Sequence, residues 1–224
     1  MLCYYVRVIK AVVIDFDDTL CLTEAICFDL ENEVLTMLGR GPMPRDIHLK
    51  TWGQPLFDAI LTRSPGVELE EFKRLYHQVI PEYTSSGKLD TIPEENVAAL
   101  DELVNDGKQL MVLTSRTHGE LKHVLEPTHD LAGRIDAFYY KDNMEFHKPD
   151  PRAFSELLEH HNLQPKECVY IGDSVSDADA ANDAGLAFIC SLESGLRTRD
   201  DFKDHKVDAF VQNFPDIVGI VRTL

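Results

Sequence analysis

The chain has 224 residues, 44% of them hydrophobic, so it can fill the core of one large domain or of a domain with a smaller module. Its 39 acidic and 22 basic residues give a formal net charge of -17, which argues against binding nucleic acid or an anionic membrane through a basic surface. The five cysteines form no CxxC pair, and we find neither a signal peptide nor a membrane span, so we expect a protein of the reducing cytoplasm.

Short apolar or β-branched runs alternate with helical patterns along most of the chain. Strands are expected in residues 8–15, 109–115, 135–140, 168–172, 186–191 and 208–212, and helices in 95–107, 150–163 and 177–185. Strands that alternate with helices are typical of a parallel sheet with right-handed crossovers. The sequence therefore predicts an α/β, Rossmann-like core with helices on both faces of the sheet.

One long segment after the first strand breaks this alternation. It has no convincing strand, but it has helical patterns in residues 23–39 and 69–83, separated by a Gly- and Pro-rich stretch, 39–55, that we expect to be a loop. Residues 84–93 carry the Ser, Gly and Pro of a connector or hinge. The predicted organisation is a core of residues 1–20 and 89–224 with a small α-helical insert of residues 21–88.

The first strand runs into three aspartates in the stretch VVIDFDDTLCL, residues 12–22. Aspartate is ordinary at strand ends and in turns, but Asp15, Asp17 and Asp18 repel one another unless a cation or unusual protonation relieves the repulsion. Ligands of an open parallel sheet bind beyond the carboxyl ends of its strands. Polar residues also follow three other strands, namely Thr114-Ser115-Arg116, His147-Lys148 and Gly172-Asp173-Ser174-Val175-Ser176-Asp177.

These residues suit a hard divalent cation and a phosphoryl group. Carboxylates are preferred ligands of Mg²⁺, while hydroxyls, backbone amides and a lysine can bind phosphoryl oxygens. The four motifs, in this order, resemble those of the haloacid dehalogenase superfamily of phosphotransferases, in particular phosphoglycolate phosphatases and β-phosphoglucomutases. They are DxDxT at 15–19, Thr114, Lys148 and GDxxxD at 172–177. The helical insert lies where this family places an α-helical cap.

The resemblance implies roles for the aspartates. Asp15 would be the nucleophile that forms an aspartyl-phosphate, and Asp17 would be the general acid and base. Mg²⁺ would be bound by the carboxylates of Asp15 and Asp173 and by the backbone carbonyl of Asp17. Because dehalogenases of this superfamily lack an acid/base aspartate at the position of Asp17, carbon–halogen hydrolysis is not expected.

The resemblance also implies how the phosphoryl group is held. Thr114, Ser115 and Lys148 would bind its oxygens, and Asp177 would orient Lys148 or a metal-bound water from behind. Asp18 is interpreted as a turn residue, and Thr19 is expected to stabilise the same turn through local hydrogen bonds.

Two features of the sequence have more than one interpretation. Trp52, Gly53 and Gln54 could contact the leaving group of a substrate, or the Trp52 ring could pack into the core of the insert. Arg116 could approach an anionic substrate tail, or it could pair with surface acids.

The function predicted from these residues is a Mg²⁺-dependent phosphatase acting on a small phosphorylated metabolite. A phosphomutase, which transfers the phosphoryl group to a sugar hydroxyl instead of water, would use the same core residues. A phosphate-binding regulatory protein without turnover is a third reading, although the intact set of Asp, Thr and Lys residues argues against it. No nucleic acid or membrane partner is expected, and the sequence gives no indication of an oligomeric state.

Overall fold

The computed structural model of the chain describes residues 8–224. The described residues divide into two compact units, one of residues 8–21 and 92–224, the core unit, and one of residues 22–91, the helical unit. Within residues 8–224 no helix combines the length and the hydropathy needed to cross a membrane.

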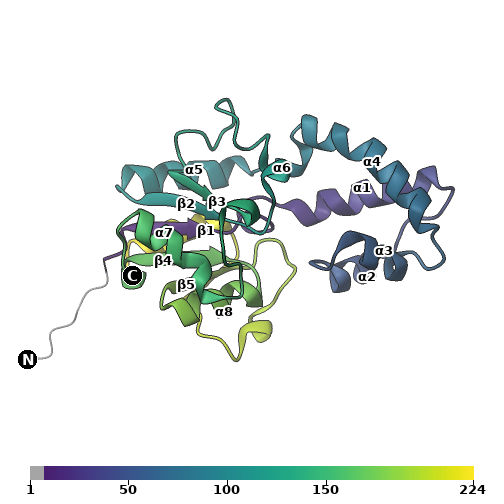
Figure 1. The fold of residues 1–224 in the computed structure, drawn as a ribbon. Helices are drawn as coiled ribbons and strands as arrows, with labels where there is room; N and C mark the ends of the chain where they lie inside the picture. Colours follow the sequence, from purple (N-terminus) through teal and green to yellow (C-terminus); the bar gives the residue numbers. More distant parts are fainter. Residues whose placement is uncertain (1–7) are drawn as a thin grey trace, which may run out of the picture. The chain divides into compact units, whose positions relative to one another are not determined.

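The core unit is built on one parallel sheet (Figure 1). The described part of this sheet has six strands in the order β3-β2-β1-β4-β5-β6. Their bounds are β1 Ala11–Ile14, β2 Gln109–Leu113, β3 Ala137–Tyr139, β4 Cys168–Gly172, β5 Ala187–Ser191 and β6 Ala209–Val211. Each strand lies inside one of the predicted runs, so the predicted parallel α/β architecture is confirmed. The order of the strands reverses between β1 and β4, which is where open sheets of this type bind their ligands.

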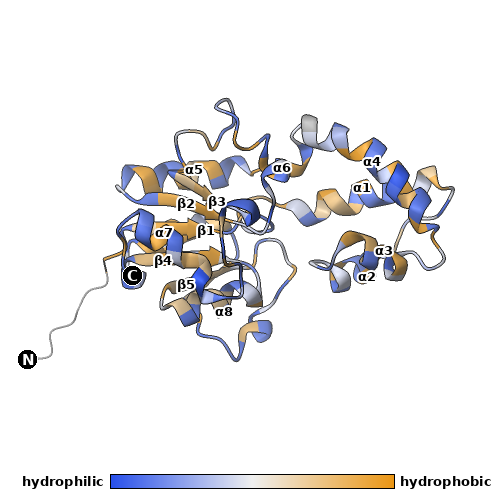
Figure 2. Ribbon diagram, viewed as in Figure 1, coloured by the Kyte–Doolittle hydropathy of each residue, from blue (hydrophilic) through white to orange (hydrophobic). Residues whose placement is uncertain are grey.

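Helices cover both faces of the sheet, because both faces of its strands are apolar (Figure 2). Alternate residues of a strand point to opposite faces. Val12 and Ile14 of β1 therefore belong to the apolar cluster of α5 (Glu94–Asn105) and α9 (Ile217–Val221). Ala11 and Val13 belong to the cluster of α7 (Ser155–His160) and α8 (Val175–Ala184). The short helix α6 (His118–Leu121) lies in the connection from β2 to β3.

The helical unit has an apolar core of its own, which includes Leu30, Val34, Ile60 and Phe72, each 0% exposed. Its helices are α1 Thr23–Met37, α2 Arg45–Thr51, α3 Leu56–Arg63 and α4 Leu69–Ser85.

The prediction of a loop over residues 39–55 is wrong, because α2 lies inside this stretch. The prolines and glycines of the stretch lie on either side of the seven residues RDIHLKT, which contain neither. Pro44 precedes the helix with an extended backbone, where its missing N–H costs no helical hydrogen bond. The composition of the whole stretch therefore concealed a helix start.

Candidate active site

The ends of three adjacent strands bring the predicted site residues together. Asp15 and Asp173 directly follow β1 and β4, which pair in register from Ala11 with Cys168 to Ile14 with Ile171. The Asp15 N–H donates to the Ile171 carbonyl at 2.8 Å, so the pairing continues to the first catalytic candidate. Thr114 follows β2, the other neighbour of β1, and its N–H donates to the Tyr139 carbonyl at 2.9 Å.

Lys148 is the centre of the polar network at this edge. Its Nζ donates to Asp15 Oδ1 at 2.8 Å, to Asp177 Oδ1 at 2.7 Å and to the Tyr170 hydroxyl at 2.9 Å. An ammonium group has three N–H donors, so these three acceptors satisfy it. The side chain of Lys148 is only 6% exposed, and it therefore places a fixed positive charge between two buried carboxylates.

Tyr170 was not predicted as a site residue. It lies in the middle of β4, where its ring packs against Phe154 and Phe188, and its hydroxyl donates to Asp177 Oδ1 at 2.9 Å. Its position in an apolar run made it look like a core residue. The available signal was chemical: a buried tyrosine usually needs a hydrogen-bond partner for its hydroxyl, whereas an aliphatic residue needs none.

The spacing of the GDxxxD motif is explained by the start of helix α8. Ser174 is the N-cap, and the Asp177 N–H donates to its Oγ at 3.2 Å, while the Ser174 N–H donates back to Asp177 Oδ2 at 3.0 Å. Asp177 thus caps the helix with one oxygen and holds Lys148 with the other. A Cβ at Gly172 would lie 2.6 Å from the Asp177 side chain, so this close approach requires glycine.

The buried carboxylates have different pKa values because their partners differ. Burial raises the pKa of Asp15 to about 7, although the charge of Lys148 partly opposes this shift. Burial raises the pKa of Asp173 well above its ordinary range, and the charges of Asp177 and Asp15 add to the shift. For Asp177 burial is outweighed by Lys148 and by hydrogen bonds from Ser174 and Tyr170, so its pKa is lowered.

The carboxylates of Asp15, Asp173 and Asp177 fit a divalent metal ion. Each offers an oxygen, and these oxygens lie within 4.8 Å of one another. Such a buried, all-oxygen donor set with excess negative charge suits Mg²⁺ better than a soft metal. Both oxygens of Asp177 accept hydrogen bonds, Oδ1 from Lys148 and Tyr170 and Oδ2 from Ser174, so Asp15 and Asp173, the pair expected from the sequence, are the better candidates to bind an ion. The predicted contribution of the Asp17 backbone carbonyl stays a prediction.

Asp17 is bound by an arginine. Arg116 donates from Nε to Asp17 Oδ2 at 3.0 Å and from Nη2 to Oδ1 at 2.7 Å, and its guanidinium lies 4.6 Å from the centroid of the Phe16 ring. The sequence left open whether Arg116 pairs with acids, and the structure shows that it pairs with a predicted site residue. Ser115, between Thr114 and Arg116, is exposed.

The turn after β1 has a strained position at Asp18. Its φ is 57°, in the left-handed region that favours glycine, and its N–H donates to the Cys21 carbonyl at 2.6 Å. Asp18 is therefore a turn residue, as expected. The predicted role of Thr19 is wrong, since within the described chain its buried Oγ1 has no hydrogen-bond partner.

Trp52, Gly53 and Gln54 lie in the helical unit, immediately after α2. The Trp52 ring is half-buried, with its centroid 5.4 Å from that of the buried His48 ring, so part of the indole packs within this unit. Gly53 has a φ of 85°, and Gln54 is exposed. Their contact with a substrate stays a prediction.

A buried network of ion pairs contacts helix α2, which ends just before Trp52. Arg63 Nη1 donates to both carboxylate oxygens of Glu31, at 2.6 and 2.8 Å, and its Nη2 donates to the Thr51 carbonyl at 3.0 Å. His48 lies between Glu24 and Glu31, with ring nitrogens 2.5 and 3.4 Å from their oxygens. Trp52 thus follows a helix end that is fixed by buried charges, which the sequence did not reveal.

Residues 12–191 match the family model described as haloacid dehalogenase-like hydrolase. The chain belongs to this family. The predicted membership of the superfamily is therefore confirmed, and the four motifs lie within this haloacid dehalogenase-like hydrolase at the positions described above.

Two curated relatives cover most of the chain. One is the phosphoglycolate phosphatase of Nitrosospira multiformis, 26% identical over 96% of this chain and 96% of the relative. Another is the phosphorylated carbohydrates phosphatase of Thermotoga maritima, 27% identical over 84% of this chain and 87% of the relative.

Solved structures share the fold at lower identity. A HAD-superfamily hydrolase of subfamily IA from Geobacter sulfurreducens has a TM-score of 0.74 at 21% identity, covering 95% of this chain and 96% of that one. CbbY from Rhodobacter sphaeroides, solved in complex with phosphate, has a TM-score of 0.67 at 20% identity, covering 93% and 96%.

Proposed function

We propose that this hydrolase is a Mg²⁺-dependent phosphatase that acts on a small phosphorylated metabolite through an aspartyl-phosphate intermediate. The observation that carries the proposal is the buried group in which Lys148 bridges Asp15 and Asp177 beside Asp173. The names of the relatives, a phosphoglycolate phosphatase and a phosphorylated carbohydrates phosphatase, support the choice of a phosphorylated metabolite as substrate.

The first half-reaction needs a carboxylate, a proton donor and positive charge. Asp15 attacks phosphorus in line with the leaving oxygen; the oxygen–phosphorus bond of the ester breaks, and Asp17 gives a proton to the departing alcohol. Lys148 and Thr114 hold the phosphoryl oxygens. Asp15 and Asp173 would hold Mg²⁺, which supplies positive charge that offsets the repulsion between nucleophile and phosphate.

The second half-reaction returns the residues to their starting state. Asp17, now ionised, takes a proton from a water molecule, and this water attacks the phosphorus of the aspartyl-phosphate. The bond to the Asp15 oxygen breaks and inorganic phosphate leaves. Lys148 stays hydrogen-bonded to Asp177 in both halves, and the donor that binds Asp15 in the structure is the one that would turn to a phosphoryl oxygen.

We assign the helical unit the role of a cap over this active site, in line with the organisation predicted for residues 21–88 and for the core of residues 1–20 and 89–224. A cap of this kind excludes water during phosphoryl transfer and selects among substrates. Trp52, Gly53 and Gln54 are its candidate substrate contacts.

The proposal is tested by measuring phosphate release from an aryl phosphate and from a panel of phosphorylated metabolites, with Mg²⁺ or with EDTA. Wild-type enzyme should turn over in Mg²⁺ only, and Asp15→Asn should lower kcat by about a thousandfold or more, because it removes the nucleophile. Asp183→Asn, which changes an exposed carboxylate of α8, is the matched control. Equal phosphate release by wild type and Asp15→Asn would exclude Asp15 as the nucleophile. No release from any compound would favour a phosphomutase or a phosphate-binding regulatory protein without turnover.

A further inference from the structure

We propose that the connection from β5 to β6 forms a second anion site, in which Arg197 and Arg199 bind the phosphate group of a small metabolite. Residues of the segment 192–200, together with Gln212 directly after β6, line a hollow of about 490 Å³, the β5–β6 hollow. The proposed phosphatase mechanism uses none of these residues, so this site does not depend on turnover.

Arg197 and Arg199 differ from the other arginines that the structure describes. Those others each bind a carboxylate, except Arg40, which donates to Ser64 Oγ and to two backbone carbonyls. Among residues 8–224 no carboxylate oxygen lies within 4.0 Å of a side-chain nitrogen of Arg197 or Arg199. In a chain with 39 acidic and 22 basic residues, two neighbouring cations without such a partner are available to an anion from solution.

The backbone directs both arginines into the same hollow. Thr198, which separates them, is extended, with a φ of -122° and a ψ of 167°, so the residues on either side of it point in the same direction. Thr198 is held in place because its N–H and its Oγ1 both donate to Asp201 Oδ2, at 2.7 and 2.9 Å. The nearby carboxylate of Asp201 is therefore bound by Thr198 and not by either arginine.

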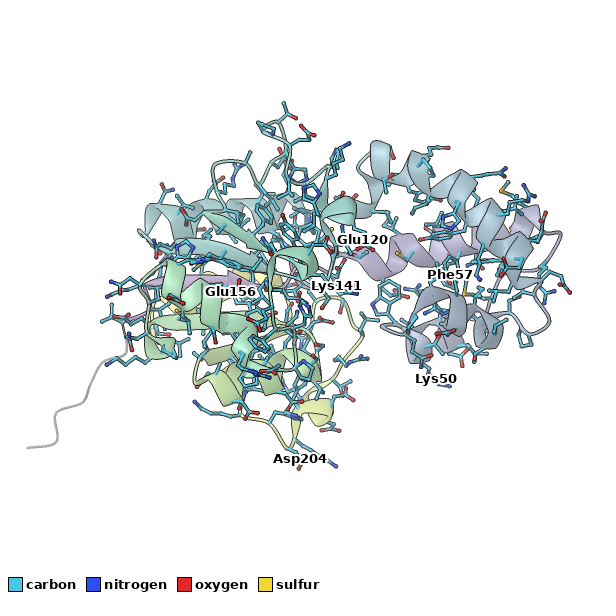
Figure 3. All side chains as sticks on the ribbon, viewed as in Figure 1. Lys50, Phe57, Glu120, Lys141, Glu156 and Asp204 are labelled. Carbon is cyan, nitrogen blue, oxygen red and sulfur yellow. The ribbon has the colours of Figure 1, made fainter. Side chains whose placement is uncertain are left out.

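The two ends of this segment are fixed to the core unit. At its start the Leu192 N–H donates to the Val211 carbonyl at 2.9 Å. At its end Phe202 is 2% exposed, and its ring centroid lies 6.3 Å from that of Phe188; Asp204, two residues further on, is labelled in Figure 3. A hollow on a segment anchored in this way is largely formed before a ligand binds, which lowers the entropic cost of binding.

The donors of the β5–β6 hollow suit a tetrahedral dianion. The Arg199 guanidinium lies 4.7 Å from the centroid of the Phe210 ring, and a guanidinium stacked on a ring keeps its N–H groups available in its own plane. Arg197 donates from Nη1 to the Leu196 carbonyl at 3.2 Å and has further N–H groups on its other nitrogens. The exposed amide of Gln212 adds a neutral donor. One guanidinium already satisfies the two oxygens of a carboxylate, whereas two of them match the extra oxygens and the charge of about -2 of a phosphate group.

The size and the place of the hollow indicate a metabolite distinct from the group bound at Asp15. A volume of about 490 Å³ lies in the range of sites for small organic ligands and is far larger than the roughly 30 Å³ that one water occupies. Strand β5 is the second strand from β1, and neighbouring strands lie about 4.8 Å apart, so the hollow is roughly 10 Å or more from Asp15. One phosphate group cannot occupy both places.

Asp200 gives the proposal a test of sign. It is exposed and lines the same hollow, so its charge opposes that of the two arginines. If the ligand is an anion, removal of this carboxylate strengthens binding, whereas removal of either arginine weakens it. A ligand held by shape alone would not respond to the two changes in opposite directions.

The test is an NMR titration of the ¹⁵N-labelled full-length protein with inorganic phosphate in EDTA, at an ionic strength kept constant with NaCl. We expect the backbone N–H signals of residues 195–200 and 212 to shift with one Kd. Arg197→Gln and Arg199→Gln should each raise this Kd about tenfold, as expected for the loss of a charge-assisted hydrogen bond, and Asp200→Asn should lower it. Arg74→Gln changes the net charge equally at an exposed position of the helical unit and should leave it unchanged.

Two results would overturn the proposal. One is an equal Kd in wild type and in the double variant Arg197→Gln/Arg199→Gln, whose remaining signals report whether it is folded. The other is that NaCl alone produces the same shifts, which would show screening instead of binding. Asp15→Asn should titrate like wild type at these signals, so failure of the proposed phosphatase function would leave this site intact.

A second ligand identifies the source of the phosphate group. Propylphosphonate carries a similar dianionic group on an organic body, and its carbon–phosphorus bond is not cleaved by a phosphate monoesterase. Tighter binding of propylphosphonate than of inorganic phosphate at the signals of the β5–β6 hollow supports a metabolite as the ligand. Tighter binding of inorganic phosphate overturns that assignment, because the free ion would then be the preferred occupant.

Discussion

Asp173 and Asp177 are both buried at the start of the same helix, yet their pKa values shift in opposite directions. The difference comes from partners: Lys148, Ser174 and Tyr170 all donate to Asp177, while burial and the neighbouring carboxylates dominate at Asp173. The residue types at these positions could be predicted from the motif. The opposite directions of their pKa shifts could not be predicted, because Tyr170, which donates to Asp177, looks like an ordinary core residue in the sequence.

At the residue scale we expect Asp173→Asn to stabilise the protein in EDTA and to remove its stabilisation by Mg²⁺. The pKa of Asp15 is raised to about 7 from an ordinary value near 3.8, so its contribution to folding is full below about pH 4 and lost as the pH rises through about 7. Burial and the charges of Asp177 and Asp15 raise the pKa of Asp173 well above its ordinary range, so folding at pH 8 carries a cost at Asp173 as well, and the substitution to asparagine removes that cost.

The measurement is the unfolding midpoint Tm at pH 8, with EDTA and with saturating Mg²⁺. A metal at a hundred times its Kd stabilises by about 2.7 kcal/mol, and a chain of this size gains about 2–4 °C per kcal/mol. Wild type should show this rise, Asp183→Asn should show it as well, and Asp173→Asn should not. An equal rise in Asp173→Asn would show that Mg²⁺ binds elsewhere.

Among the secondary-structure elements, those of the core could be predicted and one of the helical unit could not. The core strands are apolar on both faces, and such runs are a strong signal even in a single sequence. The start of α8 is earlier than the predicted residue 177, because Ser174 caps the helix and the cap depends on Asp177. Helix α2 was missed because glycine and proline at its flanks hid seven helix-compatible residues.

The contact between the end of β4 and the first turn of α8 leads to a prediction for Gly172→Ala. The new Cβ would lie 2.6 Å from the Cβ and Cγ of Asp177, so Asp177 must move and weaken its bonds to Lys148 and Ser174. We expect a loss of stability of about 1–3 kcal/mol, as for other overpacked sites, together with a fall in kcat. Urea unfolding and steady-state kinetics measure the two effects.

Gly219→Ala is the matched control for this substitution. Gly219 lies within helix α9, and a Cβ there would have no atom within 4 Å. Alanine at that position should be neutral or stabilise by up to about 1 kcal/mol, because it lowers the entropy of the unfolded chain. If both variants behaved alike, the close approach of Gly172 and Asp177 would not be important for either folding or activity.

On the scale of the whole molecule, the sequence indicated an insert because a long segment had no strand, and the structure contains a separate helical unit of residues 22–91. The interior of that unit was not predictable. The buried pair of Glu31 and Arg63 joins residues 32 positions apart, and neither has a pattern that distinguishes it from a surface charge. Such a pair becomes recognisable only when helix packing removes both groups from water.

Each unit has its own apolar cluster, so we expect the core unit to fold when residues 22–91 are replaced by a short Gly-Ser linker. The two ends of the insertion are close, because Asn96 Nδ2 donates to the Leu20 carbonyl at 3.3 Å, and a short loop can join them at low entropic cost.

The shortened chain retains Asp15, Lys148 and Asp173. It should therefore still hydrolyse an aryl phosphate, while kcat/KM for the preferred metabolite falls about tenfold or more, because the shortened chain lacks the proposed cap. Circular dichroism, cooperative urea unfolding and the substrate panel measure these outcomes, with the fragment of residues 22–91 as the companion test of the helical core. A shortened chain that unfolds without cooperativity would show that the helical unit is needed to fold the core. A folded one with unchanged metabolite kinetics would exclude its role as a cap.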